Sequence, residues 1–499
     1  MPKDHSADLM QSLMAKLYST VTGDDPAIKL PRNKFVSWMM PGIPFEARDF
    51  NFGVKGLIGE TAEETRELQH QAWTISKLFD FVPEVGNDPS EFIDVSMQQT
   101  IWSTTQDSIS SVYRDILRYS RVVNLELSEK EKKKLQKFRD LLTVEVEEED
   151  LITEEKRTVT KPGKLTLAYT DKMNEYIEAA DEYINVLIDA QSAQGNDPEA
   201  IRRVAAFANK SKFLRKKMEA AEMAWIAQGY KNEYEQINAY INQVTMKSMV
   251  LYKQDLLRKF DQGMLTSTAE GQAGDFYYTA LLPGNWARSK GWTNFTYYDQ
   301  DYESHFNKKV SSWSAKAGFG MGLFSIGAKA SGSKTEVASD QKSTNFRASL
   351  EFTQVPICRP WFDPGFFSMR GWDLDKLWDL NYGKTKVSDG KEKPVGRLIA
   401  YPVQALFVRN AHFKYDEWEN HYKYMKKQIS GGGSVGWGPF SVGGSYSRGS
   451  EKRDFEAKAE GGGIRIPGIQ LIGFINNLVP KCPDLHPDIK PDQLVGGEQ

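Results

Sequence analysis

Glycine is distributed very unevenly along this chain of 499 residues. Of its 39 glycines, residues 87–262 contain three and residues 263–499 contain 30. Glycine weakens helix interiors and is favoured in turns and where strands pack closely. The distribution therefore predicts an α+β fold, in which an N-terminal elongated α-helical bundle or coiled-coil region is followed by a duplicated, Gly-rich antiparallel β region.

The helical signal is strongest in residues 163–262. Apolar side chains in its first segment recur at alternating intervals of four and three residues, which is the spacing of one helix face. They are Tyr169, Met173, Tyr176, Ala180, Tyr183 and Leu187. A Gly-Asn-Asp-Pro turn at 195–198 and Gly229 divide the region, so we expect three antiparallel helices of about 30 residues each, packed through this stripe.

Shorter signals precede this arm. Apolar periodicity and capping residues predict helices over residues 6–20, 60–81, 95–122 and 130–142. Residues 143–160 alternate β-branched with acidic residues, which is typical either of a two-stranded excursion or of a charged loop.

The glycine-rich part repeats itself at an offset of 116 residues. Residues 320–327 and 436–443 share the pattern G-x-G-x-F-S-[IV]-G, and residues 302–306 match 418–422 in the same register. We therefore predict a duplicated β unit. Each copy is expected to contain an entry strand with an aromatic-Glu-x-His-aromatic motif, a Gly-rich strand pair, a charged linker and a return strand.

Both copies alternate apolar with small or polar residues, as a strand with two different faces does. The apolar residues then change parity at Phe324 in the first copy and at Phe440 in the second, which predicts a bulge or a tight turn at each place. Such alternation over about ten residues also suits a membrane-spanning β-strand. The candidate residues for membrane insertion or assembly are Trp313, Phe319, Met321, Leu323, Phe324, Val435, Trp437 and Phe440.

These signals divide the chain into six predicted parts. They are a mixed, mainly helical N-terminal region (1–162), a long antiparallel helical arm (163–262), a first Gly-rich β repeat (263–358), an inter-repeat connection (359–397), a second Gly-rich β repeat (398–480) and a Pro-rich flexible tail (481–499).

Motifs that carry catalytic chemistry are scarce. Neither Gly-rich run continues into a phosphate loop or a dinucleotide fingerprint, and the nucleophile-elbow and zinc-protease motifs do not occur. The pairs Glu303/His305 and Glu419/His421 place a carboxylate and an imidazole on one face of each predicted entry strand, a spacing that suits a metal. Because no third ligand accompanies either pair, we interpret both as structural packing motifs and predict no metal, no cofactor and no enzymatic activity.

The segment Tyr302-Glu303-Ser304-His305-Phe306 is similar, over five residues, to the Tyr-Gly-Thr-His-Tyr part of the signature of the membrane-attack-complex/perforin family. Glu303 stands where that family has glycine, and no Gly-Gly pair follows at the expected distance. The functional expectation therefore depends on the strand pattern and not on this likeness.

Two functions fit the pattern. In the first, the chain is a non-enzymatic, membrane-active protein of the pore-forming type, a soluble monomer that oligomerises and inserts residues 311–332 and 428–449 into a lipid membrane as β segments. In the second, it is a self-assembling filament or shell protein that uses the helical arm and strand edges for subunit contacts. A glycine-rich strand pair that simply packs closely in a soluble β-sandwich remains the alternative for the same segments.

Charge and end sequences complete the expectations. The net charge of -3 argues against a nucleic-acid partner, which leaves copies of the chain itself and a membrane as the expected partners. The first residues lack the apolar stretch of a secretory signal, and few cysteines occur, so we expect a cytoplasmic protein or one released by a non-classical route.

Overall fold

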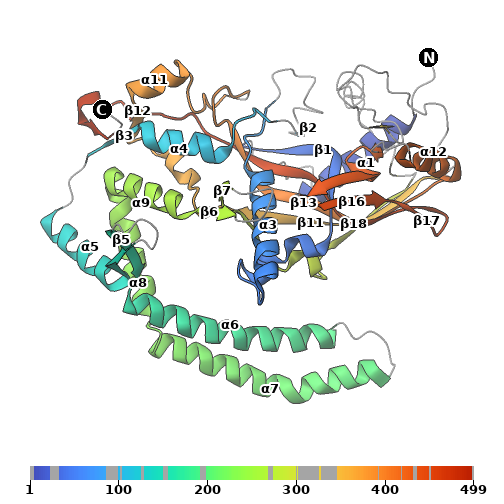
Figure 1. Cartoon of the computed structure of the whole chain (residues 1–499), viewed down its shortest axis with the longest axis horizontal. Helices are drawn as coiled ribbons and strands as arrows, with labels where there is room; N and C mark the ends of the chain where they lie inside the picture. Colours follow the sequence, from blue (N-terminus) through green and yellow to red (C-terminus); the bar gives the residue numbers. More distant parts are fainter. Residues whose placement is uncertain are drawn as a thin grey trace. The chain divides into compact units, whose positions relative to one another are not determined.

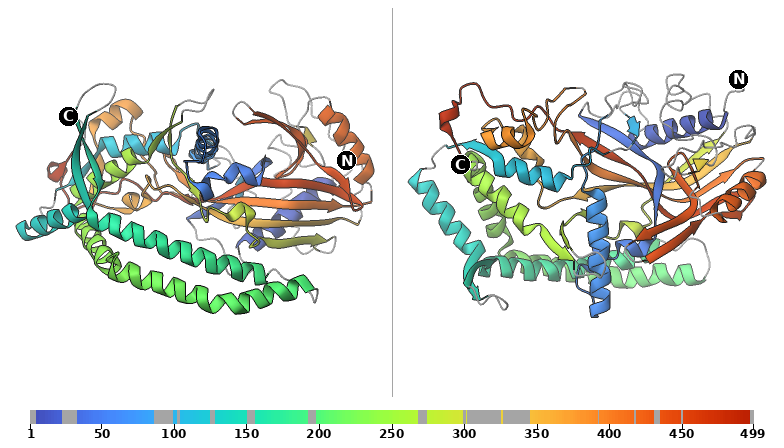
Figure 2. Two further views of the ribbon diagram at one scale, coloured as in Figure 1. Left: turned by 60° about the horizontal axis from the view of Figure 1, so that its bottom comes forward. Right: turned by 45° about the horizontal axis from the view of Figure 1, so that its top comes forward.

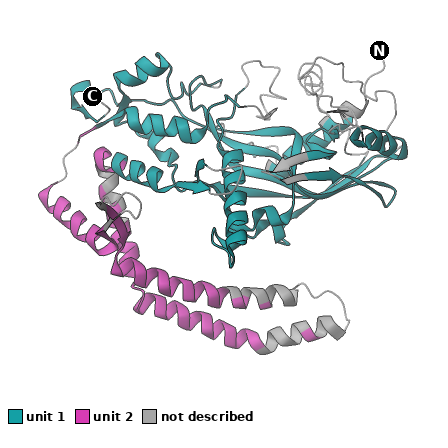
Figure 3. Cartoon of the chain, in the orientation of Figure 1, with its two compact units in different colours: residues 1–122, 253–499 teal, residues 123–252 magenta. Residues whose placement is uncertain are grey.

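The computed structural model describes residues 5–22, 33–85, 99–101, 104–124, 128–149, 156–191, 198–267, 274–298, 301, 325–326, 345–391, 393–416, 418–430, 435–448 and 451–496. The chain forms two compact units, which Figure 3 distinguishes by colour. Unit 1 contains residues 1–122 and 253–499, and unit 2 contains residues 123–252. Helices and several antiparallel sheets occur together, which confirms the α+β class, whereas the duplication of the β region stays a prediction.

A large, almost wholly antiparallel sheet forms the centre of unit 1 (Figure 1). Its strand order is β2-β1-β18-β13-β11-β8, with β9 also beside β11 and β17 beside β18. The strands are β1 (Lys34–Phe45), β2 (Gln99–Ile101), β8 (Ala280–Leu281), β9 (Thr293–Tyr298), β11 (Arg347–Cys358), β13 (Ala400–Lys414), β17 (Lys458–Glu460) and β18 (Gly463–Leu478). Figure 2 shows the long strands β11, β13 and β18, coloured yellow to red, running side by side.

The two faces of this sheet belong to separate apolar cores. On β13, Leu406 and Val408 contribute to one core and Phe407 to the other, because successive strand residues point to opposite faces. Strand β18 is buried along most of its length on both faces, and it is rich in isoleucine, leucine and phenylalanine as such a central strand requires.

Helices and single-turn 3-10 segments surround the sheet. They are α1 (His5–Thr22), η1 (Ala47–Phe50), α2 (Phe52–Lys55), α3 (Ala62–Phe79), α4 (Ile109–Tyr119), α9 (Met249–Gln262, whose first turn belongs to unit 2), η2 (Trp286–Arg288), η4 (Pro364–Ser368), α11 (Lys376–Tyr382), α12 (Trp418–Ser430) and η5 (Pro491–Gln493). The helices predicted over 6–20 and 60–81 are confirmed as α1 and α3. The helix predicted over 95–122 is shorter, because the Ser108 hydroxyl accepts a hydrogen bond from the Ser111 amide and caps the start of α4.

Smaller sheets complete unit 1. One has the order β10-β14-β15-β16, with β10 (Ser325–Ile326), β14 (Val435–Trp437), β15 (Phe440–Arg448) and β16 (Glu451–Glu456). Another joins β12 (Trp372–Leu374), β3 (Ser120–Val123) and β19 (Leu494–Val495), and a last one pairs β6 (Met264–Ser267) with β7 (Gly274–Tyr277).

Unit 2 consists mainly of helices. Its elements are α5 (Glu129–Leu142), β4 (Thr143–Glu149), β5 (Lys156–Pro162), α6 (Lys164–Gln191), α7 (Pro198–Ala227) and α8 (Lys231–Lys247). The alternating segment 143–160 therefore contains two paired antiparallel strands, with Thr143 opposite Pro162 and Val146 opposite Val159.

Aromatic stacking packs the helical arm of unit 2. Tyr169 of α6 stacks on Tyr234 of α8 with 3.9 Å between ring centres, and Tyr176 stacks on Trp225 of α7. The expected helices are confirmed, although the third one is divided at Ser248 into α8 and α9. The coiled-coil bundle that we expected from these helices stays a prediction.

The predicted entry strand of the second repeat copy is wrong. Residues 418–422 begin helix α12, in which His421 and Met425 are buried four residues apart. Trp418, Tyr422 and Ile429 pack against the core that contains Met425 and are four and seven residues apart, so the helical period describes this segment better than strand alternation.

Candidate functional site

Two long connections leave one end of the central sheet and return to it. Residues 299–346 connect β9 to β11, which pair directly, with Tyr298 opposite Arg347. Residues 415–462 connect β13 to β18, which also pair, and Lys414 at the end of β13 lies opposite the same Arg347. Each connection therefore starts and ends on neighbouring antiparallel strands, at the same end of the sheet.

The two predicted amphipathic segments lie inside these connections. Residues 311–332 belong to the first connection and residues 428–449 to the second. Of the first segment, the structure describes Ser325 and Ile326, which pair antiparallel with Gly436 and Val435 of the second segment. The two glycine-rich segments thus meet each other in one sheet. The remaining predicted residues of the first copy, which lie outside the described part of the chain, are Glu303, His305, Trp313, Phe319, Met321, Leu323 and Phe324.

The second copy forms a buried hairpin. Val435, Trp437 and Phe440 are each 0–1% exposed and belong to the larger apolar core. Trp437 pairs with Phe440 across a two-residue turn, and this turn is the parity change that was expected at Phe440. Gly438 in the turn has φ +54°, a conformation that favours glycine, and a Cβ there would lie 2.5 Å from the Met10 sulfur, so the Met10 side chain would have to shift.

Helix α1 packs against this hairpin and against the sheet. It buries one apolar face in the core that contains the hairpin, and the residues of that face are Leu9, Met10, Leu13, Met14, Leu17, Tyr18 and Val21. Polar contacts hold the helix at its middle and at its C-terminal end. The Tyr297 hydroxyl of β9 donates to Ser12 Oγ at 2.9 Å, and Gln354 Nε2 of β11 donates to the Val21 carbonyl at 2.7 Å.

Two ion pairs join the connections to N-terminal elements. Lys16 Nζ of α1 contacts Asp301 Oδ2 at 2.8 Å, just after β9 ends. Arg453 Nη1 of β16 contacts Asp49 Oδ1 of η1 at 2.7 Å, and the exposed fractions of these two side chains are 12% and 6%. Asp49 Oδ2 also accepts the Glu46 amide at 2.8 Å, which holds the carboxylate in place.

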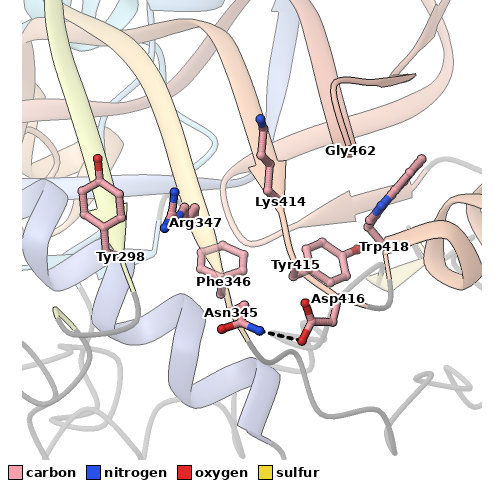
Figure 4. A pocket seen from close by; sticks show the side chains of 9 residues that line it. All are labelled: Tyr298, Asn345, Phe346, Arg347, Lys414, Tyr415, Asp416, Trp418 and Gly462. Carbon is pink, nitrogen blue, oxygen red and sulfur yellow. Dashed lines mark hydrogen bonds between the residues drawn. The ribbon is translucent and has the colours of Figure 1, made fainter.

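A pocket of about 860 Å³ opens where both connections leave the sheet (Figure 4). Its lining includes Tyr298 of β9, Arg347 of β11 and Lys414 of β13, which are mutual register partners and therefore lie on one face of the sheet. The side of the pocket nearest α12 is formed by other residues. Asn345 Nδ2 donates to Asp416 Oδ2 at 2.8 Å there, as the dashed line in Figure 4 shows.

The Glu419/His421 pair does not form a site. In α12 these residues are two positions apart and therefore point to different sides of the helix, which corrects the expectation that they share one strand face. His421 is buried and its Nδ1 lies 3.0 Å from the Tyr415 hydroxyl, whose pKa is raised by burial, while Glu419 is exposed. The packing interpretation of this pair is the one that the geometry favours.

Other reactive groups offer little chemistry. In the described ranges, no three His, Cys, Asp or Glu side chains come together as a metal site. Burial raises the pKa of the Cys482 thiol, so this cysteine stays protonated and unreactive at neutral pH. Arg359 is buried as well, and burial lowers its pKa to about 10, but it donates to the carbonyls of Pro402 in β13 and Phe79 in α3 and so ties this strand to the end of that helix.

Two components of this region escaped sequence reasoning. The periodicity of α1 identified a helix but not the surface that it covers. The Asp49–Arg453 pair joins residues 404 positions apart, and no local pattern signals such a contact.

Among the described residues, no helix is long and apolar enough to cross a bilayer. Comparison with protein-family models, curated proteins and solved structures finds no match, so the function is argued from the site itself.

Proposed function

We propose that this chain is a non-enzymatic, membrane-active protein of the pore-forming type, which folds as a soluble monomer, oligomerises and inserts two β segments. The observation that carries the proposal is topological. Each amphipathic segment connects two neighbouring antiparallel strands at one end of the central sheet. Each connection can therefore extend its flanking strands as a hairpin while the sheet behind it stays paired.

The lengths suit this role. Two bilayer-crossing strands need about 20 residues together with a short turn. The connections 299–346 and 415–462 are each more than twice that long. They can reach across the hydrocarbon region and still leave residues for the interface.

The residue pattern of β15 suits a strand between lipid and water. Phe440 and Val442 have one parity and are buried against the core, whereas Ser441 and Ser445 have the other and are partly or fully exposed. In a membrane hairpin the first set would face lipid and the second a polar lumen.

Burial explains why such a hairpin stays folded in water. Val435, Trp437, Phe440 and Val442 are all at most 1% exposed. Exposing four such side chains to water costs about 6–12 kcal/mol at about 1.5–3 kcal/mol each. Lipid hydrocarbon would return most of this free energy, so release costs far less at a bilayer than in solution.

Dye release from liposomes tests the proposal. We expect the purified chain to release an encapsulated dye from vesicles and to form ring-shaped particles on the bilayer by electron microscopy. Intact vesicles after exposure to the chain across several lipid compositions, pH values and protease treatments would contradict it.

A specific observation also favours the second candidate, a self-assembling structural protein. Unit 2 has more exposed large apolar side chains than the much longer unit 1, counted over the described residues. Phe213 and Met223 of α7 are 71% and 72% exposed, and such side chains on one arm are typical of subunit contacts.

Sedimentation without lipid separates the two candidates. A structural protein assembles in solution, and Phe213→Ser with Met223→Ser would disperse it, while the matched variant Leu380→Ser on α11, which is 79% exposed, would not. A monodisperse monomer at high concentration would count against the structural role and is what a pore-forming monomer requires.

A further inference from the structure

Two cations face each other at the end of the sheet where the connections leave. Arg347 and Lys414 are direct register partners on β11 and β13, and both side chains are exposed. No carboxylate in the described part of the chain forms an ion pair with either of them. Like charges directly opposite each other destabilise a sheet pair, so this arrangement carries a cost that an anion would remove.

The two carboxylates Glu351 and Glu460, which lie close to this pair, already have arginine partners. Glu351 accepts from Arg409 at 2.7 Å, and Glu460 accepts from Arg465 at 2.7 Å. Within the described ranges Arg347 therefore has no partner of opposite charge, and Lys458, opposite Arg465 on the same face, adds a further exposed cation.

Two further groups border the pair. Asp416, on the α12 side of the pocket, accepts the Asn345 amide hydrogen bond. His412 lies two residues before Lys414 on the same strand face, and its pKa is lowered by burial and by the positive charges of Lys414 and Arg465. This histidine is therefore neutral at pH 7, and the positive charge is concentrated on the exposed pair.

The pocket that holds the pair has the size and lining of a headgroup site. Its volume of about 860 Å³ lies in the range of small-molecule sites. Tyr298 lies beside Arg347, with the guanidinium 5.5 Å from the ring centre, and Trp418 stands on the opposite side of the opening. Tyrosine and tryptophan favour the boundary between hydrocarbon and water, because each has an apolar ring and one polar group.

We propose that this pocket binds the phosphate of a net-negative phospholipid headgroup between Arg347 and Lys414, and so directs this end of the sheet toward the bilayer. The inference deepens the proposed function and depends on it for the identity of the partner as a membrane. The position of the pocket is consistent with that function, because both connections leave the sheet around it. Segments that extend from this end of the sheet would therefore meet the bilayer whose headgroup the pocket binds.

Vesicle sedimentation tests the site with the full chain. Vesicles of phosphatidylcholine alone are compared with vesicles that also contain phosphatidylglycerol, and soluble glycerol phosphate is titrated separately. The test variant is Arg347→Gln with Lys414→Gln. The matched control, Lys376→Gln with Lys384→Gln, removes the same charge from exposed lysines that do not line the pocket.

We expect the test variant to bind phosphatidylglycerol vesicles about 30-fold more weakly than the unmodified chain, since each cation near an anionic surface contributes roughly fivefold. The control pair is expected to bind nearly normally, and Arg347→Lys with Lys414→Arg to keep most of the binding. Because all four side chains are exposed, circular dichroism and thermal melts should show unchanged folding for every variant.

Three outcomes would overturn the site. The first is that the control variant loses as much vesicle binding as the test variant, and the second is that the test variant binds vesicles as well as the unmodified chain. The third is that glycerol phosphate binds while vesicles do not, which would make the ligand a free phosphate. Dye release recorded in the same samples separates the two proposals. Binding that depends on lipid charge, without dye leakage, supports the headgroup site and contradicts pore formation. Leakage that does not depend on lipid charge supports pore formation and contradicts the headgroup site.

Discussion

The buried ion pair between Asp49 and Arg453 is expected to hold the second connection in its folded place. Replacing Asp49 with asparagine keeps the shape of the side chain but removes the charge that Arg453 Nη1 contacts at 2.7 Å. The guanidinium stays 12% exposed and loses this carboxylate. Strand β16, which carries Arg453, should then detach from η1 more easily.

The magnitude follows from the burial of the pair. Removing one partner of a buried pair costs about 3–5 kcal/mol, and we take the lower end because Arg453 retains some contact with water. About 3 kcal/mol raises the population of the detached state roughly 100-fold, since 1.4 kcal/mol is a factor of ten. The compensating pair Asp49→Asn with Arg453→Met should recover much of this loss, because it leaves no buried charge.

Native-state hydrogen exchange measures the detached population directly. We expect Asp49→Asn to speed exchange of the β15 and β16 amides and to shorten the lag before dye release. The control Glu46→Gln removes one carboxylate from the same segment, but its ion pair with Arg48 is half exposed, so it should change little. If Asp49→Asn lowers global stability while β15 and β16 exchange no faster than the rest of the sheet, the reasoning is refuted.

Three further predictions concern single positions. Gly438→Ala should lower the free energy of unfolding by about 1–2 kcal/mol in urea titrations, because residue 438 has a positive φ. Adding Met10→Ala to this variant should recover only the part of the loss that comes from contact between the new Cβ and the Met10 sulfur. His421→Ala should destabilise the chain by about 2–4 kcal/mol in the same titrations, because it empties a buried position beside Tyr415, and equal stability would show that α12 does not depend on it. The pKa of His412 in the folded chain lies below its ordinary value. As pH falls through about 6.5, the unfolded chain therefore binds more protons than the folded chain, and the free energy of unfolding should fall. His412→Gln should abolish this contribution to the pH dependence of stability.

Local rules account for what sequence reasoning obtained. The helices α1 and α3 follow from apolar periodicity and capping, and the turn at Gly438 follows from the parity change at Phe440. Each of these signals is contained in a few neighbouring residues. The candidate residues Val435 and Trp437 were identified by the same alternation, and they lie in the buried hairpin.

Long-range pairing accounts for what it did not obtain. Strand β1 lies in the expected N-terminal region of mainly helical character, yet its register partners, such as Gly473 opposite Trp38, come from the far end of the chain. The likeness between the repeat copies predicts a strand at residues 418–422, whereas the helical spacing of His421 and Met425 agrees with helix α12. The cation pair at Arg347 arises only when neighbouring strands are aligned.

Lipid exposure of single labelled cysteines along β15 tests the central claim most directly. Fluorophores are placed at Ser441, Val442 or Ser445 in a chain that carries Cys358→Ser and Cys482→Ala, and quenching is compared between nitroxide lipids and an aqueous quencher. A label on the exposed face of α6 serves as the control. Pore formation predicts that vesicles expose the label at 442 to lipid while the labels at 441 and 445 remain accessible to water. Labels that all keep their vesicle-free signal, in a sample that binds the vesicles, would contradict insertion of this segment.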